Sequence, residues 1–386
     1  MTESMRGKAT IVGVGLTKTA LTTKIKGLPG WTGEDLYVEA FQNAIDDAGL
    51  RKEDIDGLMT QGAANHYIVL GQQLGINPAY GGTLNGGGAT AGMMIGAAAM
   101  AVHHGLANYV AITFASGWER PAPGAPPPES GGPEAIPWAH WGALGPIIQS
   151  ATSASRHMAV YGTKSEQLAA IAVAFRKHAT LNPSAIMQKP LTVEDHQNSR
   201  WIVEPLKLLD CCLVSSGGVC LIVTTTERAR DLRQPMVSIL GFGQGFTTQN
   251  LERQTWWAGP HQRDAIQRAY TMAGVGPKDI QVAQIYDNFT GNVVMQIEHA
   301  GFCGVGEGGP FVEGGRIQLG GQLPLNTDGG QLSHTHPEGF MQVAEGVLQM
   351  RHQCGPRNVP NAHLELVTGR GMALNAASAL VLTDQV

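Results

Sequence analysis

Three side chains in the second half of the sequence have the types and positions needed to move protons. Tyr286 follows the strand-like run from Val282 onward, and His334 and His336 lie in one glycine-flanked turn. Tyrosine and histidine can exchange protons with a substrate and hold an enolate by hydrogen bonding. A histidine can equally be structural, and a tyrosine can simply end a strand with its hydroxyl hydrogen-bonded. Both interpretations stay open at this stage.

The cysteines predict neither a metal site nor a redox pair. They include no Cys-x-x-Cys pair and no Cys/His cluster with zinc spacing. Cys303, in the turn Gly-Phe-Cys-Gly, is a candidate nucleophile, but small thiols in glycine-rich turns are usually packed and inert. Cys211 and Cys212 lie next to Leu208-Leu209-Asp210 and are predicted to lie in the core. We therefore expect reduced thiols and no bound metal.

Composition limits the class of protein. A chain of 386 residues with 43% hydrophobic content exceeds the size at which single cores stop growing, about 250 to 300 residues, so we expect two halves. The net charge is −5 and the basic residues are dispersed, which predicts no binding to nucleic acid or to an anionic membrane. The N-terminus resembles neither a signal peptide nor a membrane span, which predicts a cytoplasmic protein.

An internal repeat supports two halves. Residues 40–55, AFQNAIDDAGLRKEDI, align without gaps to residues 265–280, AIQRAYTMAGVGPKDI. Each copy predicts a helix ended by a glycine with positive φ, at Gly49 and Gly274, followed by a turn and a strand. The strand at 220–224 and the strand at 379–383 would close the two halves, which we place at 1–230 and 231–386.

Other segments fit this scheme. The nearly all-apolar stretch 89–102 predicts a buried helix, and 109–114 predicts a buried strand. The Pro/Gly/Trp-rich stretch from Trp118 to Gly145, within an insertion at 118–150, predicts a lid or binding loop, or else a surface excursion. Together with the Trp256-Trp257 pair it suggests a substrate with a bulky apolar or aromatic group, although such tryptophans also pack at dimer contacts.

Several longer segments resemble one known family. They are RHMAVYGT at 156–163, EQLAAIAVAFRKHATLNPSA at 166–185, PLTVEDHQNSR at 190–200, EPLKLLDCC at 204–212, IYDNFTGNVVMQIEHAGFCGVGEGGPFVEGG at 285–315 and LPLNTDGGQLSHTHPEGF at 323–340. In order and spacing they resemble the sterol-carrier-protein-like branch of the thiolase superfamily, including its thiolase-like steroid side-chain aldolases. The resemblance implies an α/β thiolase fold, with two βαβαβ-type halves in a five-layered α-β-α-β-α arrangement, and a homodimer.

The resemblance also shows what is missing. The places of the three cysteines that thiolases of this branch use fall at Gly88, Val367 and Asn288. A glycine cannot form an acyl-enzyme, so ordinary covalent thiolase catalysis is not expected. The Gly-His-Pro turn persists as Thr335-His336-Pro337. By the resemblance, His336 and Tyr286 would hold a thioester enolate, with Asp287 orienting its neighbours.

A second oxyanion hole is implied at main-chain N–H groups near Gly88, Gly369 and Gly371. We therefore predict an acyl-CoA lyase that cleaves a β-hydroxyacyl-CoA by retro-aldol reaction, with coenzyme A as part of the substrate and no covalently bound cofactor. Two alternatives remain: a thiolase-type acyltransferase acting on a β-ketoacyl-CoA, and a non-catalytic acyl-CoA-binding subunit. The resemblance further implies a small zinc-ribbon/OB-fold partner of the DUF35 type, giving a heterotetramer.

Overall fold

The computed structural model describes residues 4–21, 33–62, 64–117, 146–247, 260–371 and 375–385. The strands are β1 (Ala9–Leu16), β2 (Gly57–Thr60), β3 (Tyr80–Thr83), β4 (Val110–Gly117), β5 (Trp201–Val203), β6 (Leu206–Lys207), β7 (Ser216–Thr225), β8 (Val237–Phe246), β9 (Val282–Gln284), β10 (Leu364–Gly371) and β11 (Ala376–Thr383). The helices are α1 (Gly33–Ala48), α2 (His66–Leu74), α3 (Thr90–His103), α4 (Pro146–Tyr161), α5 (Ser165–Ala179), α6 (Val193–Asn198), α7 (Thr226–Ala229), α8 (Pro260–Ala273), α9 (Thr290–His299), α10 (Gly308–Phe311), α11 (Gly330–Ser333) and α12 (Phe340–Met350).

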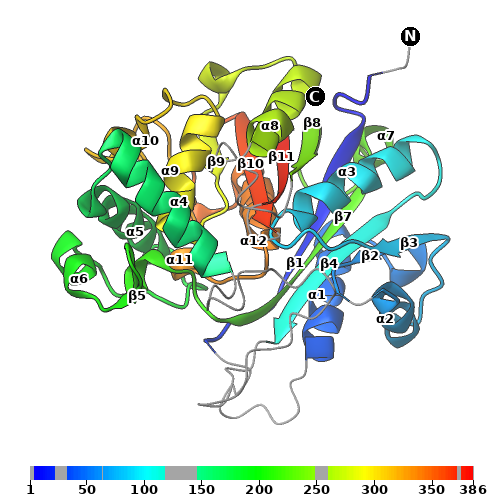
Figure 1. Ribbon diagram of the computed structural model, residues 1–386. Helices are drawn as coiled ribbons and strands as arrows, with labels where there is room; N and C mark the ends of the chain where they lie inside the picture. Colours follow the sequence, from blue (N-terminus) through cyan, green and yellow to red (C-terminus); the bar gives the residue numbers. More distant parts are fainter. Residues whose placement is uncertain are drawn as a thin grey trace.

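Within these ranges nine strands form one continuous mixed sheet in the order β3-β2-β4-β7-β1-β8-β11-β10-β9. Its middle is narrow, because β1 and β8 are paired only through Thr10 with Ser238 and Ile11 with Val237 in the described part of the chain. The sheet therefore consists of two smaller sheets joined at a short seam, as Figure 1 shows around β1 and β8.

The two smaller sheets repeat the same pairing pattern. β2 runs parallel to β4, which is antiparallel to β7, which is antiparallel to β1. β9, β10, β11 and β8 repeat these relations in the same order. The strands predicted at 220–224 and 379–383 are β7 and β11, at equivalent places. The predicted positive φ at the helix ends is confirmed, at +72° for Gly49 and +69° for Gly274.

Close contacts between helix and strand explain the matching alanines of the repeat. A Cβ added at Gly15 of β1 would lie 1.9 Å from the carbonyl oxygen of Ala40, and one at Gly243 of β8 would lie 2.0 Å from that of Ala265. Ala44 and Ala269, one helical turn later, meet strand glycines in the same way. Only glycine on the strand and a small residue on the helix permit such an approach. The matching alanines of the repeat are therefore the residues at which α1 and α8 pack closely on their sheets.

The helices α3 and α12 pack against each other and against strands of both smaller sheets, so they form the central layer, while α1 and α8 cover the outer faces. The predicted helix at 89–102 and strand at 109–114 are confirmed as α3 and β4. This arrangement is the five-layered thiolase fold. It places the start of α3 and the turn before α12 side by side.

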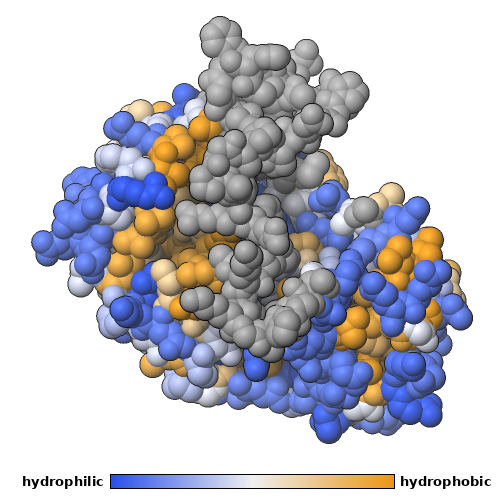
Figure 2. All heavy atoms as spheres, turned by 90° about the horizontal axis from the view of Figure 1, so that it is seen from below, coloured by the Kyte–Doolittle hydropathy of each residue, from blue (hydrophilic) through white to orange (hydrophobic). Residues whose placement is uncertain are grey.

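Two predictions fall outside the described residues: the loop from Trp118 to Gly145 and the Trp256-Trp257 pair. Among the helices that are described, none is long and apolar enough to cross a bilayer. Apolar surface lies on both sides of the grey segments in Figure 2. Exposed apolar side chains include Ile68 and Val69 of α2 and Val160 and Tyr161 of α4.

Candidate active site

A cavity of about 150 Å³ lies where the two halves meet. It is bounded by the segment before α3, the segment after β9, the turn before α12 and the end of β10. β9 and β10 are parallel, so their carboxyl ends open on the same edge of the sheet, which is the usual place for chemistry in α/β folds. Its lining residues are Gly87, Gly88, Pro146, Cys212, Tyr286, Asn288, Phe289, His336, Glu338, Arg370 and Gly371.

The backbone of Tyr286 is fixed by two side chains. Its N–H donates to Oγ1 of Thr368 at 3.2 Å, and its carbonyl accepts from Nε2 of Gln296 at 2.6 Å. Thr368 in turn donates to Oε1 of Gln296 at 2.9 Å. These three hydrogen bonds tie the tyrosine to β10 and α9, so the direction of its ring is set by buried structure.

The ring of Tyr286 fills the space that a side chain at position 88 would occupy. A Cβ added at Gly88 would lie 2.0 Å from Cζ and 2.3 Å from the hydroxyl oxygen of Tyr286. Such distances do not occur between real atoms, so residue 88 has to be glycine while the tyrosine keeps this position. The glycine at the place of the thiolase nucleophile and the tyrosine after β9 therefore depend on each other, because the ring fits only where residue 88 has no side chain.

The hydroxyl of Tyr286 faces two other polar groups. It lies 3.4 Å from Nε2 of His336, and it donates to Oε2 of Glu338 at 3.4 Å. Burial and the negative charge of Glu338 raise the pKa of Tyr286 well above its usual value, so the phenol is protonated and is a hydrogen-bond donor at neutral pH. Burial lowers the pKa of His336, which is therefore neutral at pH 7.

The turn that carries His336 is hydrogen-bonded to Ser215, which directly precedes β7. The N–H of His336 donates to Oγ of Ser215 at 2.9 Å, and this hydroxyl lies 3.0 Å from Oγ1 of Thr335. Nδ1 of His336 lies 3.6 Å from Sγ of Cys212. Burial raises the pKa of the Cys212 thiol well above its usual value, so the sulfur is protonated rather than a thiolate.

Asp287 orients its neighbours by hydrogen bonding, as predicted. Its carboxylate accepts hydrogen bonds from the N–H groups of Gln331 and Leu332 at 3.0 and 3.2 Å, at the start of α11. Nε2 of Gln342 in α12 donates to it at 3.0 Å. Burial raises the pKa of Asp287 to about 7, even though these hydrogen bonds oppose the shift. Asp287 thereby joins the tyrosine segment to the histidine turn.

The structure brings most of the predicted site residues together. Tyr286, His336, Gly88 and Gly371 line the cavity. Gly369 lies directly behind it, since a Cβ there would be 2.7 Å from the carbonyl oxygen of Gly88. These glycines let the segment before α3 and the end of β10 approach within a distance that no larger residue permits.

His334 is placed differently. Its Nδ1 lies 2.6 Å from Oδ2 of Asp328, both side chains are buried, and His334 is not among the cavity residues. Cys303 is also outside the cavity lining, and burial raises the pKa of its thiol to about 12. Neither residue is in a position to meet a substrate held beside Tyr286.

Sequence reasoning missed three residues of the site. Cys212 was predicted to lie in the core, but it forms part of the cavity wall. Glu338 has a φ of +46°, uncommon for a residue other than glycine, and its proximity to the predicted histidine turn was the available signal. Arg370, between two predicted glycines, is buried in the wall, and burial lowers its pKa to about 10. It supplies positive charge to the wall of the cavity.

No cluster able to hold a metal lies among the described residues of this cavity. The arrangement offers a neutral phenol, a neutral imidazole, a carboxylate and an arginine around a small space. Such a set suits proton transfer and stabilisation of a developing negative charge, without a nucleophile at position 88.

Comparison with known proteins agrees with this description. Residues 243–384 match the thiolase C-terminal domain-like family. The chain is 37% identical to the 17-hydroxy-3-oxo-4-pregnene-20-carboxyl-CoA lyase of Mycobacterium tuberculosis, over 90% of this chain and 92% of that one. It is 38% identical to the steroid side-chain-cleaving aldolase of Thermomonospora curvata, over 89% and 90% of the two chains.

A solved structure of an Ltp2-ChsH2(DUF35) aldolase superposes with a TM-score of 0.90, at 36% identity and over the full length of both chains. The fold and the cavity thus define a thiolase-type protein without the thiolase nucleophile. The chain belongs to the thiolase superfamily, in the branch of the steroid side-chain-cleaving aldolases.

Proposed function

We propose that this protein is an acyl-CoA lyase whose substrate is a β-hydroxyacyl-CoA in which the acyl group is the side chain of a steroid. It cleaves the Cα–Cβ bond of this acyl group by a retro-aldol reaction. The observation that carries the proposal is the ring of Tyr286 in the space above Gly88, where a thiolase would need its cysteine. The activities named for the two steroid-cleaving relatives support the substrate class.

The reaction needs a proton acceptor for the β-hydroxyl group and a site for the enolate. Glu338 is the carboxylate in the cavity and accepts the hydroxyl proton directly, while the phenol of Tyr286, hydrogen-bonded to Glu338 without substrate, turns to the thioester oxygen. As the Cα–Cβ bond breaks, its electron pair moves into the thioester, and the β-carbon becomes the carbonyl of the first product. The enolate then takes a proton at Cα and leaves as the shortened acyl-CoA.

Tyr286 and His336 hold the enolate. The phenol of Tyr286 is protonated because its pKa is raised, so it donates to the thioester oxygen as negative charge develops there. His336 donates to the same oxygen through Nε2, the ring nitrogen that lies 3.4 Å from the phenol oxygen. The buried guanidinium of Arg370 lowers the energy of the negative charge across the cavity. In our proposal, backbone N–H groups at Gly88 and Gly371 contact the thioester, and Gly369 behind them permits the close approach of β10.

Coenzyme A enters this scheme as part of the substrate, and no covalently bound cofactor is needed for any step. We further propose a cytoplasmic homodimer that pairs with a small zinc-ribbon/OB-fold protein of the DUF35 type to give a heterotetramer. The name of the superposed Ltp2-ChsH2(DUF35) aldolase supports this partner. Apolar surface on either side of the grey segments in Figure 2 is of the kind that protein partners cover.

One observation favours a second candidate function, acyl transfer between a β-ketoacyl-CoA and free CoA. Cys212 lines the cavity with its sulfur 3.6 Å from Nδ1 of His336, which resembles a nucleophile beside its base. The raised pKa of the thiol counts against it, because the thiolate is the reactive form. A Cys212→Ala variant separates the two functions.

The test is to incubate the purified protein, with and without a co-expressed DUF35-type partner, with β-hydroxyacyl-CoA thioesters that carry a steroid side chain. Chromatography should detect a ketone or aldehyde together with the shortened acyl-CoA in equal amounts, and Cys212→Ala should retain this activity. Release of no carbonyl product across the panel, with CoA-dependent cleavage of a β-ketoacyl-CoA that Cys212→Ala abolishes, would establish acyl transfer instead. Turnover of neither substrate class, even with the partner, would leave acyl-CoA binding as the function.

A further inference from the structure

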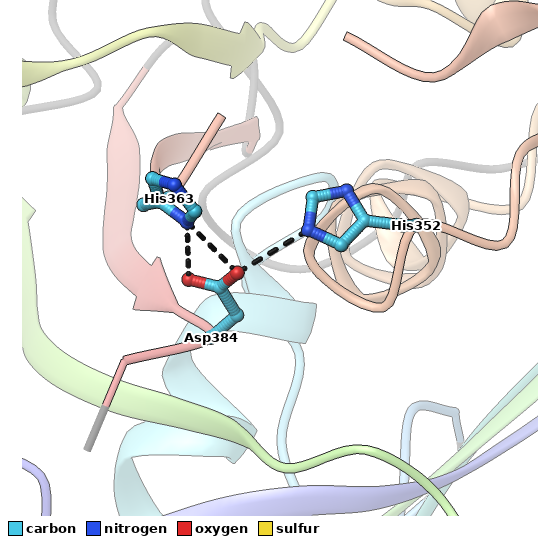
Figure 3. A group of neighbouring side chains, drawn as sticks. All are labelled: His352, His363 and Asp384. Carbon is cyan, nitrogen blue, oxygen red and sulfur yellow. Dashed lines mark hydrogen bonds and ion pairs between the residues drawn. The ribbon is translucent and has the colours of Figure 1, made fainter. Parts of the chain in front are cut away.

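A second group of polar side chains lies at the end of α12 and β10 opposite to the cavity. His352 follows α12, His363 precedes β10, and Asp384 follows β11. The cavity residues Glu338 and Arg370 lie at the other ends of α12 and β10. Figure 3 shows the two imidazoles turned toward the one carboxylate, each from a different element.

The distances within this group match those of a metal site. Nε2 of His352 lies 3.3 Å from Oδ2 of Asp384, and Nδ1 of His363 lies 3.0 Å from both carboxylate oxygens. The three ligand atoms all lie within 4.8 Å of one another. Tetrahedral zinc with bonds of about 2.0 to 2.1 Å places its ligands about 3.3 Å apart. An ion therefore fits after small rotations of the side chains.

The backbones that carry the three residues are fixed in advance. His352 has a φ of +56°, and its carbonyl accepts from Nδ2 of Asn358 at 3.0 Å. The N–H of His363 donates to Oε1 of Gln281 at 2.6 Å, while its carbonyl accepts from the hydroxyl of Thr383 at 2.7 Å. Thr383 directly precedes Asp384. Binding an ion would thus cost little backbone ordering.

The chemistry of the ligands selects the type of ion. Two imidazole nitrogens and one carboxylate suit zinc, cobalt, nickel or copper, whereas calcium and magnesium require oxygen ligands. The side chains of His352 and His363 are 45% and 40% exposed, so water can complete the coordination. We propose that His352, His363 and Asp384 bind one divalent transition-metal ion such as zinc, which links the end of α12 to the start of β10 and the end of β11.

The same contacts would also arise from two histidine–aspartate ion pairs with no metal, so the test must measure binding itself. Apoprotein prepared with EDTA is titrated with ZnCl₂ by calorimetry, and with CoCl₂ while the visible absorption of the bound ion is followed. The variants are His352→Gln and His363→Gln. The matched control is His103→Gln, whose ring packs edge-on against that of His104 at 4.9 Å, without a place in the cluster.

We expect one zinc ion per chain at this site, at least tenfold weaker binding in both cluster variants, and no change in the control. Zinc should raise the melting temperature of the wild-type protein and of the control, but not of the cluster variants. Melting in EDTA shows that each variant is folded. Absence of zinc binding by the folded wild-type protein, or equal affinity in wild type and both cluster variants, would overturn the proposal.

Discussion

Replacing Tyr286 with phenylalanine removes one oxygen atom from the cavity and leaves the ring in place. The backbone of residue 286 is held by Thr368 and Gln296, and neither contact involves the hydroxyl group. The ring still fills the space above Gly88. The variant therefore separates the chemistry of the hydroxyl group from the packing of the ring.

The expected effect on stability is small and the effect on turnover is large. The hydroxyl makes two long contacts of 3.4 Å, to His336 and Glu338, and losing them should cost about 1 kcal/mol or less. Removing one donor from an oxyanion site typically lowers kcat by about 10² to 10³, or roughly 2.7 to 4 kcal/mol. We expect a loss of kcat in this range, because the phenol is a protonated donor that faces the cavity.

The assay follows formation of the shortened acyl-CoA from a saturating β-hydroxyacyl-CoA, beside thermal unfolding of the same samples. Tyr270→Phe is the matched control: this tyrosine is equally buried and its hydroxyl donates to the carbonyl of Ala300 at 3.2 Å, outside the cavity. Its kcat should be unchanged. A Tyr286→Phe enzyme whose kcat lies within threefold of wild type would refute the role assigned to the phenol.

Three further predictions concern packing and charge. Gly88→Ala should abolish turnover and cost about 1 to 3 kcal/mol of stability, because the added methyl group overpacks against the ring of Tyr286. Gly82→Ala is the control: no atom lies within 4 Å of the added Cβ, so turnover and stability should not change. An active Gly88→Ala enzyme would contradict the packing argument. Burial raises the pKa of Glu365 to about 8, so the folded state binds its proton more tightly than the unfolded state, and the stability due to this group falls as pH rises from about 4.5 to 8. Glu365→Gln should remove this pH dependence, so the variant should be more stable than wild type at pH 8. Urea unfolding at several pH values measures the difference in free energy of unfolding between the two proteins. A difference that is the same at every pH would show that the pKa of Glu365 is not raised. His334→Ala should lower the free energy of unfolding by about 3 to 5 kcal/mol, because it leaves the carboxylate of Asp328 buried without its partner. The kcat per folded molecule should be retained. A variant as stable as wild type in chemical denaturation would exclude this pairing.

Much of the fold could be predicted from local patterns. The helix at 89–102 is apolar on every side, so it had to be buried, and α3 lies in the central layer. The repeat at 40–55 and 265–280 predicted matching helices, each ended by a glycine with positive φ, and both glycines have it. These features depend on residues close together in the chain, where hydrophobic period and backbone conformation act directly.

The partners within the site could not be predicted in this way. Cys212 and His336 are 124 residues apart in the chain, and their contact depends on how the segment before β7 meets the turn before α12. The same local pattern, a histidine in a glycine-flanked turn, holds for His334 and His336. Only the buried Asp328 beside one and the phenol beside the other give them different environments.

The sequence by itself determined that position 88 has no nucleophile, and that a tyrosine and a histidine turn remain where the family places its chemistry. The absence of a side chain is a covalent fact, so no folded arrangement could restore it. Only the tertiary structure decided that Tyr286 occupies the vacated space, with Glu338 and Arg370 beside it. Packing between segments distant in the chain set these distances, and proton transfer depends on distance.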